Sequence, residues 1–173
     1  MTNKNPTPLD YEEVVSTEET ELPISPLQKK LQNLEFVPLV TLAIGLFFKL
    51  QSWPYATEIL LTGGTLSASL YLFFSWFMFR VGKYRPLEVI LSILCGLAFA
   101  TGIFAILFRM QDWERSEQLV NYGLKAIVFF LFVSIVLFAF HIKDKRASVF
   151  YRNLISRLLI FTVLLLYISR IYF

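Results

Sequence analysis

Five long apolar runs, separated by short polar stretches, dominate the pattern of hydrophobic positions along this chain of 173 residues. They cover residues 36–53, 56–79, 87–108, 117–140 and 154–173. A helix rises about 1.5 Å per residue, so about 20 apolar residues cross a hydrocarbon core about 30 Å thick. We therefore predict an all-α integral membrane protein whose five-helix transmembrane domain covers residues 31–173.

A repeat with an offset of sixty residues relates the first two runs to the third and fourth. The stretch FKLQSW at residues 48–53 returns as FRMQDW at residues 108–113, and Gly63 returns as Gly123. Apolar helices resemble one another in composition, so only the shared polar and special positions are informative here. They predict two helical hairpins, related by a rotation about an axis along the membrane normal, followed by one C-terminal helix.

Composition and charge agree with this class and orient the predicted helices. The chain is 56% hydrophobic and 17% aromatic, which is more apolar surface than one soluble core of this length can bury. Basic residues gather after the second and fourth runs, as at Arg85 and Arg146, whereas the turns at Trp53 and Trp113 have no such excess. Because cytoplasmic loops carry the excess of Lys and Arg, the N-terminus is predicted to be cytoplasmic and both Trp turns and the C-terminus to face outward. Glu88, close to Arg85, is expected to form a surface ion pair.

Residues 1–30 form an acidic segment before the first apolar run. It contains four prolines and six acidic residues with only scattered apolar side chains. Such a segment cannot bury enough surface to order itself, so we predict a disordered cytoplasmic tail. Alternatively, apolar residues such as Val14 and Ile24 form a short motif that docks a cytoplasmic partner. The tail lacks the pattern of a signal peptide, so the first run is expected to act as its own insertion signal.

The last run, residues 154–173, is open to two interpretations. It carries Arg157 and Arg170, one near each end, and their long side chains are expected to reach the lipid headgroups. A basic amphipathic helix that lies in the interface would have a similar composition. The continuous apolar core of residues 158–168 favours a helix that spans the membrane.

Seven candidate binding residues lie towards the outer ends of the first four runs. They are aromatic, charged or amide side chains: Lys49, Trp53, Glu58, Arg109, Trp113, Asn121 and Lys125. The two indole rings are expected at headgroup level, one helical turn from Lys49 and Arg109. The repeated motif therefore either anchors each hairpin in the interface or binds a lipid headgroup or an acidic loop of a partner.

Lys125 is the candidate that anchoring alone does not explain. It lies eight positions after Glu117, about 12 Å into the fourth run at helical rise. A basic group at mid-depth in a membrane costs at least about 2.5 kcal/mol, and less nearer the surface. In one interpretation the Lys125 side chain reaches past Asn121 towards Glu58 or the interface. In the other, Lys125 lines an outward-facing polar cavity together with Glu58, Asn121 and Tyr122. In the second case it would bind an anionic group.

The stretch FKLQSWPYA, residues 48–56, resembles the N-terminal membrane hairpin of GldL, the gliding-motility and type IX secretion motor protein of Bacteroidota. This resemblance implies a hairpin of common type in a bacterial inner membrane. The chain departs from the family at Ser52, where the family has histidine, and at Tyr55, where it has glycine. The intramembrane glutamate of the motor would fall at Ser67 or Ile127, and neither residue is ionisable. The resemblance therefore does not imply a proton-driven motor.

No stretch of the sequence carries a recognisable reaction chemistry. The chain has no nucleophile elbow, zinc-protease or phosphate-loop motif, and its one Cys and one His rule out a disulfide within the chain and the usual metal clusters. We predict a non-enzymatic membrane protein without cofactors or a nucleic-acid partner, in contact with the lipid bilayer. The favoured function is an interaction or scaffold subunit that binds other membrane proteins. The alternative is a small transporter or channel-like component with a basic, outward-facing cavity around Lys125.

Overall fold

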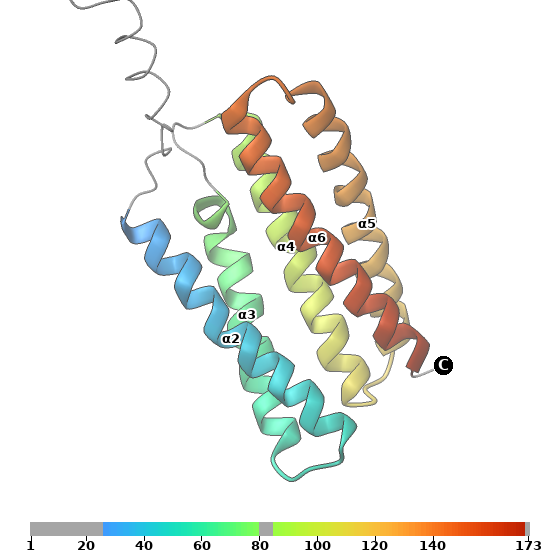
Figure 1. The fold of residues 1–173 in the computed structure, drawn as a ribbon. Coiled ribbons are helices and arrows are strands. Elements are labelled where there is room, and N and C mark those ends of the chain that lie inside the picture. Colours follow the sequence, from blue (N-terminus) through green and yellow to red (C-terminus); the bar gives the residue numbers. More distant parts are fainter. Residues whose placement is uncertain (1–25, 80–84, 172–173) are drawn as a thin grey trace, which may run out of the picture.

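The computed structural model describes residues 26–79 and 85–171, and the regular structure in these two ranges is entirely helical (Figure 1). Its five helices are α2 (Pro26–Leu50), α3 (Ala56–Met78), α4 (Pro86–Met110), α5 (Ser116–Phe140) and α6 (Lys145–Ile171). All five are long and apolar enough to cross a membrane. The prediction of an all-α chain with five such helices is confirmed for this part of the chain.

The helices pack in chain order around α4. Extensive contacts join α2 with α3, α3 with α4, α4 with α5 and α5 with α6, and α4 also contacts α6. The helix α4 is 61% buried along its apolar span, the largest fraction of the five. The turns between α2 and α3 and between α4 and α5 lie at one end of the bundle, and the connection from α5 to α6 lies at the other end (Figure 1). Consequently α2, α4 and α6 run in the same direction.

Two helices begin earlier than the apolar runs predicted. The predicted disordered tail extended to residue 30, but α2 begins at Pro26, since proline is tolerated in the first helical turn; residues 1–25 lie outside the described residues. The last helix begins at Lys145 rather than at residue 154, because Asp144 caps it. The Asp144 carboxylate accepts hydrogen bonds from the amides of Arg146 (3.1 Å) and Ala147 (3.3 Å).

The repeated motif ends two helices in the same way. Four residues adopt left-handed φ angles at matching positions: Ser52 (53°), Tyr55 (62°), Asp112 (53°) and Arg115 (60°). The amide of Trp53 donates to the carbonyl of Phe48, and that of Trp113 to the carbonyl of Phe108, both at 3.0 Å. These bonds and the left-handed residue before each tryptophan define a Schellman ending. The first predicted run extended to Trp53, whereas α2 ends at Leu50.

The aromatic pair of each motif belongs to the same helix ending. The rings of Phe48 and Trp53 lie 4.8 Å apart, and those of Phe108 and Trp113 lie 4.6 Å apart. An apolar contact between these two positions commonly accompanies a Schellman ending. The phenylalanine and tryptophan of the sixty-residue repeat are therefore explained by how the helices stop. The relation between the two complete hairpins stays a prediction.

Candidate functional site

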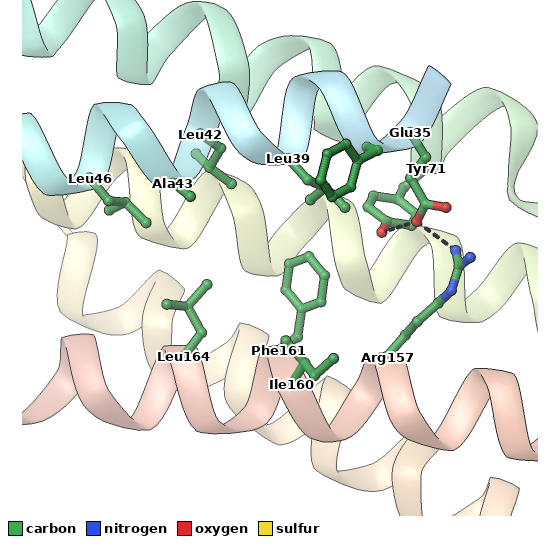
Figure 2. A pocket seen from close by; sticks show the side chains of 11 residues that line it. Glu35, Leu39, Leu42, Ala43, Leu46, Tyr71, Arg157, Ile160, Phe161 and Leu164 are labelled. Atoms are coloured by element: carbon green, nitrogen blue, oxygen red, sulfur yellow. Dashed lines mark hydrogen bonds and ion pairs between the residues drawn. The ribbon is translucent and has the colours of Figure 1, made fainter. Parts of the chain in front are cut away.

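A buried polar cluster joins three helices that are far apart in the chain (Figure 2). The hydroxyl of Tyr71, on α3, donates to Oε1 of Glu35, on α2, at 2.5 Å. Nη1 of Arg157, on α6, lies 2.5 Å from the same oxygen and is 122 residues away in sequence. The Glu35 side chain is 8% exposed and that of Arg157 is 26% exposed. One carboxylate oxygen therefore accepts from both a phenol and a guanidinium in the interior of the bundle.

Aromatic rings from α4, from α6 and from the end of α3 surround the cluster. The guanidinium carbon of Arg157 lies 4.9 Å from the ring centroid of Phe79, within the range of cation–π contacts. The Tyr71 ring packs against Phe99 at 4.9 Å and against Phe161 at 5.9 Å, measured between centroids. These contacts hold the phenol and the guanidinium in fixed positions, since aromatic and cation–π pairs favour specific geometries.

An apolar cavity of about 470 Å³ extends from this cluster between α2 and α6 (Figure 2). Apart from the cluster, its walls carry apolar side chains: Phe36, Leu39, Leu42, Ala43, Leu46, Ile160, Phe161 and Leu164. From Glu35 to Leu46 the α2 wall covers twelve residues, about 16 Å at helical rise. We call this cavity the α2/α6 slot; it is apolar along its length and polar at one end.

Helical spacing explains why these side chains share one slot. On α2, Leu39, Leu42 and Leu46 follow Glu35 at positions i+4, i+7 and i+11, which lie on one face of a helix. On α6, Phe161 and Leu164 follow Arg157 at i+4 and i+7. Each charged residue is therefore the first position of an apolar stripe, and the two stripes face each other.

The expectation for Arg157 is wrong about its place in the helix. Arg157 was predicted near the beginning of the last helix, but α6 begins at Lys145. The predicted reach of its side chain to the headgroups stays a prediction. Arg157 lies twelve positions further on, about 18 Å along the helix, and pairs with Glu35. Sequence analysis did not single out Glu35. The available signal was charge balance, because a basic residue well inside an apolar helix requires an acidic partner.

A second group of charges joins the starts of α4 and α6. Arg85 lies 2.6 Å from Asp144 and 3.8 Å from Glu88, and Arg146 lies 3.6 Å from Glu88. The predicted pairing of Arg85 with Glu88 is confirmed, but the Glu88 side chain is only 9% exposed, so the pair is not a surface one. This group ties the N-terminal ends of two parallel helices together.

The pairing with Arg85 makes the contribution of Asp144 depend on pH. The hydrogen bond from the Arg85 guanidinium lowers the pKa of the Asp144 carboxyl below its usual value. A lowered folded-state pKa means that Asp144 stabilises the fold above about pH 4 and loses this effect as the pH falls through the lowered pKa. We expect the melting temperature of the purified protein to fall less steeply between pH 5 and pH 3, roughly, in Asp144→Asn. In Asp112→Asn, an exposed control, the slope should equal that of the wild type; equal slopes in all three would contradict the prediction.

The seven predicted binding residues do not form one site. Trp53 and Trp113 are 49% and 46% exposed and belong to the two helix endings described above. A smaller cavity of about 280 Å³ lies between α4, α5 and α6, and its lining includes Arg109 and Asn121 together with Glu117. The structure therefore brings two of the predicted residues together, beside an acid that the analysis had placed at the start of the fourth run.

Lys125 and Glu58 lie on helices that are not neighbours. Lys125 is exposed on α5, which packs on α4 and α6, and Glu58 is exposed on α3, which packs on α2 and α4. Neither residue lines the smaller cavity, and Tyr122 is 65% exposed. The predicted polar cavity of Lys125 with Glu58, Asn121 and Tyr122 is not formed among the described residues. Lys49 lies half-buried near the end of α2, and a binding role for it or for Lys125 stays a prediction.

Comparison with models of protein families, with curated proteins and with solved structures found no match to this chain. The resemblance of residues 48–56 to the GldL hairpin therefore stays a prediction. Among the described residues, no three His, Cys, Asp or Glu side chains come together in a way that could hold a metal ion. The Glu35–Tyr71–Arg157 cluster and its slot remain the best-defined site in the structure.

Proposed function

We propose that this chain is a multi-pass protein of a bacterial inner membrane and acts as an interaction or scaffold subunit of a larger membrane assembly. Large apolar side chains are exposed on every helix: Phe36, Phe73, Ile93, Phe132 and Ile160 are examples. Such continuous apolar exposure is costly in water and favourable in lipid. Helices also satisfy their own backbone hydrogen bonds, as a membrane interior requires.

The proposed orientation has the N-terminus in the cytoplasm and the C-terminus in the periplasm. The charged group around Arg85 and Arg146 lies at one end of the bundle, and the two tryptophan turns lie at the other. The positive-inside rule favours the cytoplasm for the first end. In this orientation residues 1–30 are cytoplasmic, so a partner that docks on this segment would be a cytoplasmic protein.

The orientation predicts a labelling pattern in intact cells. In a Cys95→Ser background, a membrane-impermeant thiol reagent added from outside should modify Asp112→Cys and leave Lys145→Cys unmodified, because the two positions lie at opposite ends of the bundle. After cell lysis both should react, which controls for accessibility. The opposite pattern would overturn the orientation, and labelling of neither position in a carbonate-extractable protein would overturn membrane insertion itself.

The observation that carries the proposed subunit function is how little of the described chain lies outside the helices. Residues 51–55, 111–115 and 141–144 are the connections that the structure describes, and each holds no more than five residues. Such turns cannot build an extramembrane domain, so partner contacts made by the described part of the chain would use the sides of the helices. The side of α2 that faces away from α3 is available for this, since Val37, Val40 and Ile44 are exposed there.

A site-specific crosslink tests the subunit function. A photoreactive residue at Ile44, on the exposed side of α2, should yield a protein adduct of defined mass when membranes are irradiated before mild-detergent purification. The same residue at Phe132, on the exposed side of α5, is the matched control for random encounters in the bilayer. Equal or absent adducts at the two positions would contradict a specific assembly.

A small transporter or channel-like component is the second candidate. The observation that favours it is the meeting of Glu35, Tyr71 and Arg157 beside a cavity of about 470 Å³. Polar groups from separate helices that meet at depth are typical of transport pathways. This version differs from the one predicted around Lys125, since the cavity lies between α2 and α6.

A further inference from the structure

We propose that the α2/α6 slot binds one long-chain carboxylate, a fatty-acid-like amphiphile, with its acyl chain along the apolar walls and its head at Arg157. The inference rests on the proposed membrane insertion and goes beyond the proposed subunit function. The slot has the two features that such a ligand needs, an elongated apolar wall and one polar end (Figure 2).

The dimensions of the slot fit a single chain. Its volume of about 470 Å³ lies within the range of about 300–1,000 Å³ that small-ligand sites have. A single flexible hydrocarbon chain can follow the apolar wall from Leu39 to Leu46 with its head at the polar end.

The polar end of the slot is rich in hydrogen-bond donors. A guanidinium carries five N–H donors in a planar fork, and Arg157 contributes Nη1 to the contact with Glu35. Its side chain lines the slot and is 26% exposed, so a ligand head in the slot would engage donors of the fork other than the one that contacts Glu35. A carboxylate matches this fork with two parallel hydrogen bonds.

Glu35 and Tyr71 hold this arginine in position, and the Glu35 carboxylate balances its formal charge. Oε1 of Glu35 already accepts from Tyr71 and from Arg157, and Phe79 covers one face of the guanidinium. Exposed basic residues lie five positions earlier on each helix, Lys30 on α2 and Arg152 on α6. Any charge in excess of the Glu35–Arg157 pair at this end therefore comes from Lys30 and Arg152, which lie outside the slot lining.

The spacing of α2 and α6 leaves the slot accessible from the side. The two helices form no extensive contact with each other in the described part of the chain; α2 packs on α3, and α6 packs on α4 and α5. The Glu35–Arg157 pair is the polar contact that bridges the space. A ligand from a surrounding bilayer can therefore enter laterally, with its chain first, and meet the arginine at the end of the wall.

The test is photolabelling of the full-length protein in phosphatidylcholine liposomes. A diazirine-bearing palmitic acid should label residues 39–46 and 160–164, as located by peptide mass spectrometry, and excess unlabelled palmitate should compete. Arg157→Lys keeps the charge but loses the fork, so the affinity of palmitate should fall roughly tenfold. Ala43→Trp fills the slot without touching the polar cluster and should abolish labelling there.

Matched controls separate the slot from ordinary lipid contact. Val37→Trp lies on the same helix, is exposed and does not line the slot, so its labelling should equal that of the wild type. Equal labelling in Ala43→Trp and Val37→Trp, or labelling spread evenly over all five helices, would overturn the proposal. Stronger labelling by a diazirine phosphatidic acid than by the fatty acid would overturn the single-chain carboxylate as occupant.

Failure of this inference can be told apart from failure of the proposed function. Loss of slot labelling in a protein that still gives the expected Asp112→Cys and Lys145→Cys pattern overturns the ligand alone. A second protein copy or another polypeptide crosslinked at Ala43 in place of lipid would assign the slot to a protein interface and overturn it as well. A protein that carbonate extracts from membranes would overturn both.

Discussion

Arg157→Met is expected to destabilise the bundle by roughly 3 kcal/mol, because it leaves the Glu35 carboxylate buried without its cationic partner. Breaking a buried ion pair costs about 3–5 kcal/mol of unfolding free energy. The lower end of this range applies here because the Arg157 side chain is 26% exposed. The measurement is unfolding in detergent micelles, followed by far-UV circular dichroism.

A double variant separates the charge from the packing. Glu35→Gln combined with Arg157→Met should regain most of the lost stability, because no uncompensated charge then remains and the new amide oxygen can still accept the hydrogen bond from Tyr71. Arg152→Met removes an exposed basic side chain of the same helix and should change the unfolding free energy by less than about 0.5 kcal/mol. If the double variant were no more stable than Arg157→Met, the ion pair would not be the source of the effect.

Gly63→Ala is the second substitution with a large expected effect. An added Cβ at Gly63 would lie 2.5 Å from the backbone nitrogen of Leu42, on the neighbouring helix α2. Backbone atoms cannot rotate away, so α2 and α3 must separate, and overpacking of this kind typically costs about 1–3 kcal/mol. Close helix approach through glycine is also a main source of stability within a membrane, where no hydrophobic force drives the helices together.

The repeat supplies the matched control for this substitution. Gly123 occupies the corresponding position, but an added Cβ there would lie 3.4 Å from its nearest neighbour, Gly102, which is close to ordinary contact. Gly123→Ala should therefore leave the melting temperature unchanged or raise it, since alanine favours a helix by up to about 1 kcal/mol over glycine. Equal losses in both variants would show that the difference in packing between the two hairpins has no energetic consequence.

Much of the architecture can be predicted because it depends on local patterns. A run of apolar residues long enough to cross a membrane is recognisable from hydropathy alone, and five such runs correspond to α2–α6. The Phe and Trp of the repeated motif were recognised as significant, but their role as a Schellman helix ending was not. A left-handed position commonly carries glycine, and here Ser52 and Asp112 occupy it instead.

The errors at the helix starts have local causes too. Pro26 belongs by composition to the acidic, proline-rich tail, but proline is favoured in a first helical turn and α2 begins there. Asp144 lies among the basic residues after α5, where it does not stand out as a helix cap. It caps α6, which therefore begins at Lys145. That single difference moves Arg157 from the end of a helix to its middle.

The sequence by itself determined the helical class, the number of apolar helices, their approximate limits and the repeated turns, because each depends on residues close together in the chain. Only the tertiary structure decided that Glu35, Tyr71 and Arg157 meet, and that Lys125 and Glu58 do not. Glu35 and Arg157 are separated by 122 residues, and their contact depends on which helices are neighbours and on how each is rotated about its axis. Helical periodicity gives the face of the helix on which a residue lies. Which helix packs against that face depends on the packing of the whole bundle, to which small residues such as Gly63 contribute.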